Sequence, residues 1–179
     1  RDPIKVKTKI GYLQENMGFY GDLNARQMLQ FIAELNGLAG KPADERIDRA
    51  LETVGLLDEA SKKIAFYSRG MRQRLGIAEL LIKDSKVAFF DEPTLGLDPD
   101  ATNRMIELIQ SLCRDKKITV LLSSHLLHQV QKICHRIGIM IKGRMVAQGP
   151  MDQLAKEKFG VGKDAYSLEE IYMKYFQES

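Results

Sequence analysis

The stretch that decides the fold is KVAFFDEPTLGLDP, residues 86–99. Four apolar residues lead directly into two adjacent carboxylates, Asp91 and Glu92, and a third, Asp98, follows six residues after Glu92. A short apolar run that ends at turn-forming residues predicts a buried strand. Ligands bind beyond the carboxyl ends of the strands in open parallel sheets, so acids at this point indicate a site.

The sequence after this stretch predicts a second strand of the same sheet. Residues 101–115 have the pattern of a helix, and residues 118–124, ITVLLSS, form another apolar run. Strand, helix and strand predict a right-handed βαβ unit, and hence a parallel sheet buried on both faces. We therefore expect Ser123, Ser124 and His125, at the end of the second strand, to lie beside the acids that end the first.

Most of the chain before residue 84 is expected to be helical. A short strand at residues 9–13 precedes predicted helices at residues 24–37, 42–56 and 70–83, with Asn24 as a candidate cap of the first. Each predicted helix has apolar residues that share one face. These are Leu29, Ile32 and Leu35; then Ile47, Leu51 and Val54; then Leu75, Ala78 and Ile82.

The last part of the chain predicts smaller elements. A helix is expected at residues 126–135, and residues 136–149 read as a β-hairpin that turns at Lys142-Gly143. One or two short helices are expected in residues 151–179. The final one carries an apolar stripe of Leu168, Ile171, Tyr172 and Tyr175, which predicts that it packs on the sheet.

Composition excludes several classes of protein. Hydrophobic residues make up 44% of the chain and charged residues 28%, which is typical of a globular domain. The net charge of +3 is too small to indicate binding to nucleic acid, and we expect no nucleic-acid partner. No apolar run approaches the roughly 18 residues of a membrane span, and the charged start does not read as a signal peptide.

The clustered acids and the histidine suggest chemistry on phosphate. One carboxylate, Asp91, can hold Mg²⁺ directly or through water, and its neighbour Glu92 can orient or deprotonate an attacking water. His125 can bond a phosphate oxygen. The alternative is structural, because acids after a strand often cap the next helix, and Ser-Ser-His can do the same.

Several motifs together resemble those of the ATP-binding cassette (ABC) ATPases. The Walker B strand and its glutamate are matched by VAFFDEP, the D-loop by LGLDP and the H-loop by LLSSH. The signature segment is matched by YSRGMRQRLGIAELLI, the Q-loop region by IGYLQENMGFYGDLNARQML and the closing hairpin by IGIMIKGRMVAQGP. The motifs stand in the family's order and cover nearly the whole chain. The signature variant is similar to that of drug and antibiotic exporters.

The resemblance implies an α/β fold of the P-loop NTPase type, with a parallel sheet core and a mostly helical subdomain. By this reading residues 1–23 are the Q-loop strand and loop, and residues 24–83 the helical subdomain that ends in the signature helix. Residues 84–150 are the α/β catalytic half, and residues 151–179 the C-terminal helices.

The resemblance also assigns roles to the acids and the histidine. Asp91 would coordinate Mg²⁺ through water, and Glu92 would be the catalytic base. His125 would contact the γ-phosphate, and Asp98 would lie at the seam between two cassettes.

The signature and Q-loop residues follow in the same way. Ser68, Arg69, Gly70 and Met71 would contact the ATP held by the opposite cassette, although Arg69 and Met71 replace the commonest glycine and glutamine. A helix N-terminus at Ser68 would favour phosphate.

In the Q-loop, Glu15 stands at the usual glutamine position and Gln14 one residue earlier. Either could serve there, and Glu15 is a second candidate metal contact.

The implied function is that of an ATP-binding and ATP-hydrolysing subunit that powers transport, with export favoured. ATP and Mg²⁺ would be its ligands, and a membrane permease and a second cassette, identical or related, its partners. The subunit would lie in the cytoplasm, peripherally on the inner face of the membrane. Alternatives are a soluble ABC-type ATPase without a transport role and a non-catalytic interaction module.

One family motif has no counterpart in the sequence. The phosphate-binding loop reads G-x-x-x-x-G-K-[ST], and no such run occurs in the 179 residues. We therefore expect an N-terminally truncated cassette that is inactive alone.

Overall fold

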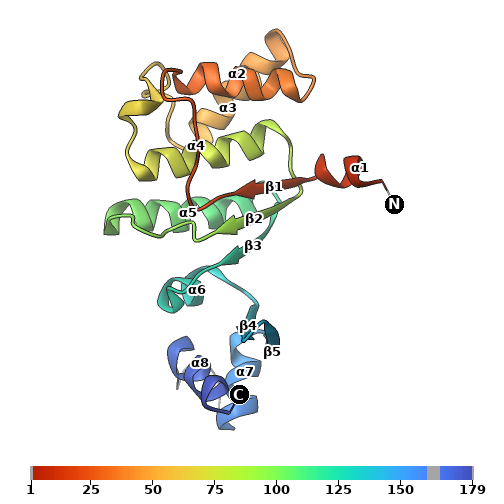
Figure 1. Ribbon diagram of the computed structural model, residues 1–179, viewed down its shortest axis with the longest axis vertical. Helices are drawn as coiled ribbons and strands as arrows, with labels where there is room; N and C mark the ends of the chain where they lie inside the picture. The colour runs from red at the N-terminus through yellow and green to blue at the C-terminus, as the bar shows by residue number, and fades with distance from the viewer. Residues whose placement is uncertain (1, 161–165, 179) are drawn as a thin grey trace. The chain divides into compact units, whose positions relative to one another are not determined.

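The computed structural model describes residues 2–160 and 166–178 of the chain (Figure 1). They fall into two compact units, residues 1–123 and residues 124–179. The sheet and the helices before it therefore belong to one unit. The assignment of four segments by role stays a prediction.

A parallel sheet forms the base of the first unit. Within its described residues the strands are β1 (Ile10–Leu13), β2 (Val87–Asp91) and β3 (Thr119–Ser123), in the order β1-β2-β3. Both strand pairs are parallel, and the register puts Asp91 beside Ser123. The parallel βαβ arrangement predicted from the sequence is confirmed.

Helices pack on one face of this sheet. Helix α4 (Arg69–Ile82) contacts β1, and α5 (Pro99–Arg114) contacts β3. Right-handed crossovers in the order β1-β2-β3 place both connections on the same side. Leu13 and Phe90 are buried on that side. Gly76 permits the close approach of α4, because a Cβ there would lie 2.6 Å from Leu13 Cδ1.

The opposite face of the sheet is exposed, contrary to the sequence-based prediction. Tyr12, Phe89 and Leu121 are register partners in a row across the three strands. Alternation along a strand points them away from α4 and α5. Tyr12 is 54% exposed and Leu121 61% exposed, so the expectation of a sheet buried on both faces is wrong here.

The helices before β2 pack on one another and on α4. Helix α2 (Ala25–Leu35) begins with a capping box, in which Asn24 Oδ1 accepts from the Gln27 N–H at 2.9 Å. Gln27 Oε1 in turn accepts from the Asn24 N–H at 3.0 Å. Helix α3 (Lys41–Thr53) follows, with a proline in its first turn. The candidate cap at Asn24 is thus confirmed.

The inward faces predicted for α3 and α4 are confirmed, and that of α2 only in part. The six predicted core residues of α3 and α4 are all buried: Ile47, Leu51, Val54, Leu75, Ala78 and Ile82. In α2, Leu29 is buried but Leu35 is 67% exposed. The buried stripe of α2 runs instead through Ala25, Met28, Leu29 and Ala33. Ala33 takes the inward position because it is four residues after Leu29, about one helical turn.

Two short helices were not predicted. Helix α1 (Pro3–Lys7) precedes β1, and the 3₁₀ turn η1 (Ile64–Phe66) leads into the signature segment. Ile64 is buried and ties this turn to the helical layer, since its N–H donates to the Leu23 carbonyl at 2.9 Å.

The second unit contains a hairpin and three helices among its described residues. These elements are α6 (Leu127–Ile133), β4 (Ile137–Ile141), β5 (Arg144–Gly149), α7 (Met151–Phe159) and α8 (Leu168–Gln177). The two strands pair antiparallel, as predicted. The turn falls where the sequence placed it, at Lys142 and Gly143, with φ values of 49° and 76°.

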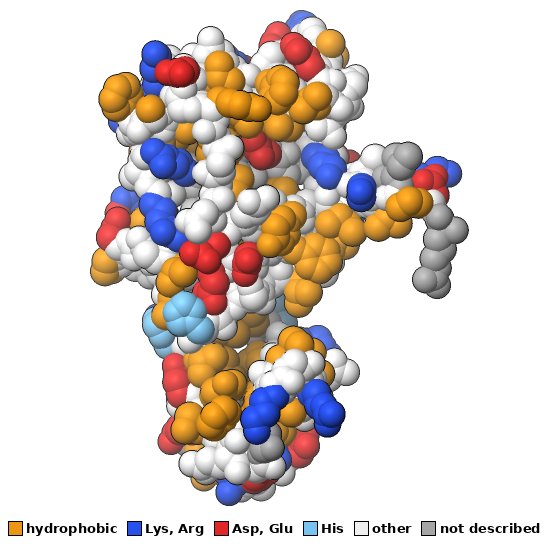
Figure 2. All heavy atoms as spheres, in the orientation of Figure 1, with side chains coloured by type: hydrophobic (Ala, Val, Ile, Leu, Met, Phe, Trp, Pro, Cys, Tyr) orange, Lys and Arg blue, Asp and Glu red, His pale blue; other side chains and the backbone are white. Residues whose placement is uncertain are grey.

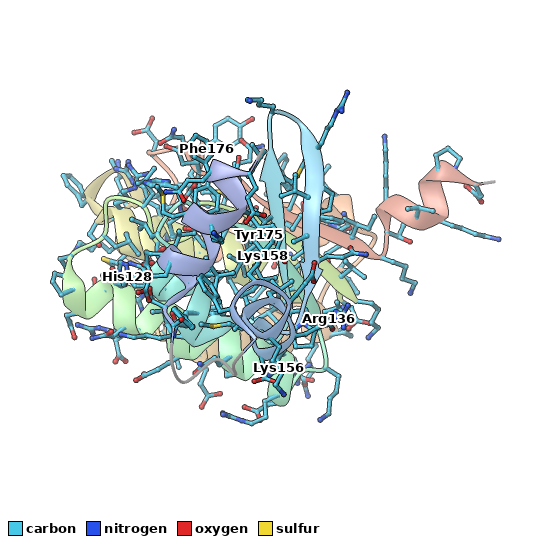
Figure 3. The ribbon with its side chains drawn as sticks, turned by 90° about the horizontal axis from the view of Figure 1, so that it is seen from below. His128, Arg136, Lys156, Lys158, Tyr175 and Phe176 are labelled. Atoms are coloured by element: carbon cyan, nitrogen blue, oxygen red, sulfur yellow. The ribbon has the colours of Figure 1, made fainter. Side chains whose placement is uncertain are left out.

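Helix α8 packs on α6 and α7 within the second unit. Three residues of its predicted stripe, Leu168, Ile171 and Tyr175, are buried. Lys158 of α7 lies over the Tyr175 ring, 4.1 Å from its centroid, and reaches Glu178 at 2.6 Å (Figure 3). In the described part of the chain, no helix has both the length and the apolar character to cross a membrane.

Candidate functional site

Asp91 is the last residue of β2, and neighbours on both flanking strands orient its carboxylate. Ser123 Oγ donates to Asp91 Oδ1 at 2.7 Å, and the Tyr12 hydroxyl donates to Oδ2 at 3.4 Å. The side chain is half-buried at the carboxyl edge of the sheet. A carboxylate offers about four lone-pair positions, so two hydroxyl donors leave capacity for a hydrated cation.

Glu92 leaves the strand in an unusual backbone conformation. Its φ is 45°, in the left-handed region that a residue with a Cβ adopts at a cost of about 1–2 kcal/mol. Its N–H donates to the Ser123 carbonyl at 3.1 Å, and its own carbonyl accepts from Leu95 N–H at 3.1 Å. The chain therefore turns sharply at Glu92, which places a second carboxylate next to Asp91 at the sheet edge.

Asp98 caps helix α5. Its Oδ1 accepts from the Ala101 N–H at 2.8 Å, and Pro99 occupies the first helical position, which suits its fixed φ. One interpretation of the sequence is that the acids after β2 cap the next helix. The cap of α5 is Asp98, and neither Asp91 nor Glu92 caps it. A position for Asp98 at a seam between cassettes stays a prediction.

Ser124 and His125 open the second unit. Ser124 Oγ accepts from the Leu126 N–H at 3.1 Å and so stabilises the turn before α6. Leu126 itself is the N-cap of α6, and no side chain caps it, so the alternative of a cap formed by Ser-Ser-His is wrong. His125 is exposed. Because His125 and the carboxylates belong to different units, its contact with phosphate stays a prediction.

The signature segment begins α4. Ser68 is the N-cap, and its Oγ accepts from the Met71 N–H at 3.2 Å. Gly70 permits close packing here, because a Cβ at this position would lie 3.2 Å from Ala101 Cβ at the start of α5, closer than most such contacts. The N-terminus of α4 thus packs closely against the N-terminus of α5.

Arg69 connects the signature to the Q-loop within one unit. Its Nη2 lies 3.7 Å from Glu15 Oε1, and its guanidinium lies against Gly96. The buried Gln73, one turn further along α4, donates through Nε2 to the Glu15 carbonyl at 2.7 Å. Glu15 is half-buried and Gln14 is exposed. The Q-loop, signature and D-loop segments therefore meet around Arg69.

Two residues of this site were missed from the sequence, Tyr12 and Gln73. Tyr12 could have been found from strand alternation, because the register places it one pleat before the level of Asp91 on the same face. Gln73 is a polar residue four positions after Arg69, hence on the same helical face, where it is 2% exposed. A buried glutamine indicates a specific hydrogen-bond partner.

The residues fit a magnesium ion held by one protein carboxylate. No group of three or more His, Cys, Asp or Glu side chains that could hold a metal is found among residues 2–160 and 166–178. Mg²⁺ commonly uses one or two carboxylates, waters and the phosphates of its substrate, so a cage is not required. Asp91 fits that role better than Glu15, whose carboxylate faces the Arg69 guanidinium.

The same order of elements is found in known proteins. The family model described as ABC transporter matches residues 2–95, over half of the chain.

This chain belongs to the ABC transporter family.

Curated ABC relatives include two from bacilli. The bacitracin transport ATP-binding protein BcrA of Bacillus licheniformis is 39% identical over 152 residues, which cover 85% of this chain and 49% of the relative. The linearmycin resistance ATP-binding protein LnrL of Bacillus subtilis is 34% identical over 160 residues, 89% of this chain and 51% of the relative. The chain thus spans about half the length of these curated relatives.

Solved ABC structures confirm the fold. An ATP-binding subunit of an ABC transporter has a TM-score of 0.79 at 27% identity, covering 97% of this chain and 71% of that one. The protein cbiO1 from Clostridium perfringens, part of the transporter complex cbiONQ, has a TM-score of 0.78 at 26% identity, with coverage of 98% and 70%. The predicted α/β ABC ATPase fold with a helical subdomain is therefore correct.

Proposed function

We propose that these residues are part of an ATP-hydrolysing subunit that powers an ABC exporter. The observation that carries the proposal is the pair Asp91 and Glu92 at the carboxyl edge of the sheet. Asp91 is oriented from both sides by hydroxyl donors, and Glu92 is held in a left-handed conformation next to it. Strained residues of this kind cluster at active sites.

The geometry supports distinct tasks for the two acids. Asp91 would hold Mg²⁺ through water, and the bound ion would supply positive charge against the phosphates of ATP. Glu92 would accept a proton from the water that attacks the terminal phosphate. Ser123 and Tyr12 would keep the Asp91 carboxylate in one orientation throughout. His125 would bond a γ-phosphate oxygen and so report its loss.

The test is Glu92→Gln in the full-length protein that contains these residues. A positioned base contributes about 10²–10⁴-fold, so phosphate release should fall by at least about 100-fold while ATP binding persists. Glu107→Gln is the matched control, because Glu107 is exposed on α5 away from the sheet edge and should retain full activity. Unchanged turnover in Glu92→Gln would remove Glu92 from the role of base.

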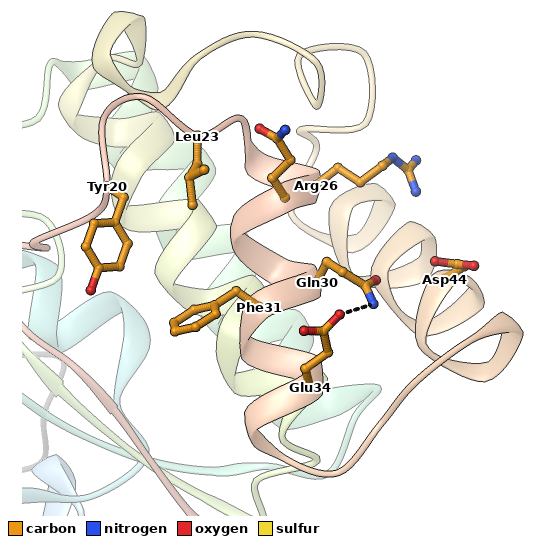
Figure 4. Close-up of a pocket in the computed structure, with 8 residues that line it drawn as sticks. Tyr20, Leu23, Arg26, Gln30, Phe31, Glu34 and Asp44 are labelled. Carbon is orange, nitrogen blue, oxygen red and sulfur yellow. Dashed lines mark hydrogen bonds between the residues drawn. The ribbon is translucent and has the colours of Figure 1, made fainter.

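The helical layer offers a surface for the membrane permease. A hollow of about 660 Å³ lies against α2, lined by Tyr20, Leu23 and Phe31 (Figure 4). The Tyr20 and Phe31 rings pack edge to face at 6.3 Å, and both are exposed. Hydrophobic side chains gather over this helical layer (Figure 2). Glu34 and Asp44 add two negative charges to its lining, and Arg26 adds one positive charge that is paired with Asp48 at 2.5 Å.

The proposed occupant is a short segment of the permease. It would pack an apolar side chain against the exposed faces of Tyr20 and Phe31 and place a basic residue near Glu34. In Phe31→Ser, co-purification with the co-expressed permease should be lost while ATP hydrolysis without the permease is retained. Leu35→Ser is the control, since Leu35 is also exposed on α2, at 67% against 41% for Phe31, but lies outside the hollow. Equal loss in both variants would contradict docking at this hollow.

The remaining parts of the proposal concern assembly and location. A second cassette, identical or related, would face Ser68, Arg69, Gly70 and Met71 and receive its ATP contacts from them. The subunit would act on the cytoplasmic face of the membrane. Export of antibiotic-like compounds is supported by the relatives named for bacitracin and linearmycin.

A further inference from the structure

A second hollow lies at the opposite end of the sheet from the two acids. It has a volume of about 220 Å³ and is formed by α3, the end of α4 and the segment before β3. Ser85 and Ile118, which line it, come just before β2 and β3, whereas Asp91 is the last residue of β2. Asp91 is six residues after Ser85, and at about 3.3 Å for each residue of extended chain the two are up to about 20 Å apart. The hollow is therefore independent of the proposed nucleotide site.

The lining of this hollow is cationic. Arg46, Arg49 and Lys116 contribute three positive charges, against the one negative charge of Asp84. The Asp84 carboxylate lies 3.1 Å from Lys86 Nζ, which offsets its charge locally. The Arg49 guanidinium is in turn 3.8 Å from Glu45 Oε2, so Arg46 and Lys116 carry the excess positive charge of the lining. A small anion in the hollow would therefore meet a net positive field.

Arg46 is held in place by the end of α4. Its Nη1 donates to the Ile82 carbonyl at 3.0 Å. The carbonyls at a helix C-terminus carry partial negative charge, which would repel an anion. Arg46 covers one of these carbonyls and presents its planar guanidinium, a group suited to phosphate recognition, at a fixed position.

Ser85 supplies an unexplained hydroxyl at the same place. The residue is 2% exposed, and its Oγ is buried without a hydrogen-bond partner in the described structure. Buried hydroxyls in native proteins are nearly always bonded, so an unpaired one indicates a missing partner. The Oγ lies on the β1 side, 3.0 Å from where a Cβ of Gly11 would be, so Ser85 would have to rotate about χ1 to donate to an anion in the hollow.

We propose that this hollow binds a single phosphate group, either as a free phosphate or as the phosphate of a lipid headgroup. At roughly 30 Å³ per water molecule, 220 Å³ is about seven waters, which suits one phosphate with some hydration rather than a nucleotide. Arg49 and Lys116 would contribute charge, Arg46 a fixed donor and Ser85 a neutral donor.

The test is a titration of the full-length protein that contains these residues with inorganic phosphate at constant ionic strength, followed by NMR of the backbone amides. The Ser85 and Lys116 amides should shift in a saturable manner. Removing two charged donors in Arg49→Gln/Lys116→Gln should weaken binding at least about tenfold. The matched control is Lys142→Gln/Arg144→Gln, which removes the same two residue types at the hairpin turn and should leave the affinity unchanged. Ser85→Ala should lower the affinity without lowering the stability of the free protein.

Vesicles distinguish the two sources of phosphate. The protein is sedimented with phosphatidylglycerol vesicles and with phosphatidylcholine vesicles. If it co-sediments only with phosphatidylglycerol, and Arg49→Gln/Lys116→Gln abolishes this, the ligand is the phosphate of a lipid headgroup. Phosphate binding without such co-sedimentation would assign the free ion. The proposal is overturned by the absence of both, and also by equal weakening in the two double variants, which would indicate only a general charge effect.

Discussion

Glu79 should make the stability of the first unit depend on pH. It lies on α4, where one of its carboxylate oxygens is buried without a hydrogen-bond partner in the described structure. Burial raises the pKa of this carboxyl from its ordinary 4.5 to about 7. Desolvation is the cause, because a buried carboxylate loses its hydration without gaining an opposite charge.

The size and sign of the effect follow from this pKa. The folded state retains the proton of Glu79 to higher pH than the unfolded state does, so its stability falls as pH rises from 4.5 through about 7. The pKa difference of about 2.5, at about 1.4 kcal/mol per pH unit, gives a loss of about 3 kcal/mol above pH 7. Below pH 4.5 the carboxyl is protonated in both states and the loss is absent.

The assay is urea denaturation of the wild type and of Glu79→Gln at intervals from pH 5 to pH 8. Glutamine is a neutral isostere, so the free energy of unfolding of the variant should exceed that of the wild type by less than about 1 kcal/mol near pH 5 and by up to about 3 kcal/mol at pH 8. The exposed Glu107→Gln controls for the loss of a carboxylate and should follow the wild type throughout. If the curves of Glu79→Gln and the wild type stay parallel from pH 5 to pH 8, the reasoning is refuted.

Two further substitutions test local features of the fold. Asn24→Ala removes the capping box of α2 and should lower the free energy of unfolding by about 1 kcal/mol, as measured by chemical denaturation. The control is Asn103→Ala, at an exposed position within α5, which should leave the free energy of unfolding unchanged. Gly96→Ala places a Cβ at φ 71° and should cost about 1–2 kcal/mol in the same assay. Gly18→Ala, with open space around it and an ordinary φ, should be nearly neutral, and an equal loss in both glycine variants would contradict the conformational argument.

The spacing of apolar residues predicted which helix residues are buried where burial depends only on one helix and the element packed against it. The inward residues Leu75 and Ile82 of α4 are buried because a helix with one apolar face has one way to pack. The same reasoning failed in α2. Leu29, Ile32 and Leu35 have helical spacing, but Leu35 does not lie on the buried stripe of the helix. Ala25 and Ala33 lie on that stripe, and alanine gives a weaker signal of burial than leucine.

The sequence predicted the site residues that lie at the ends of neighbouring strands. It did not predict the contacts between segments that are far apart in the chain. The order of strands brought Asp91 and Ser123 together as expected, since neighbouring parallel strands end at one edge. The pairing of Arg69 with Glu15 joins residues 54 positions apart through the packing of α4 on β1. Neither a motif nor a spacing encodes such a contact, because it depends on the three-dimensional path between the two segments.

The backbone of Glu92 has a consequence for how this position can vary. A residue without a Cβ would adopt φ 45° at no steric cost, so glycine at position 92 would relieve about 1–2 kcal/mol of backbone strain in the first unit. Selection for stability alone would therefore favour glycine, and a library screened only for folding should enrich it. A screen for transport should restore glutamate, so the two screens would diverge most sharply at this residue.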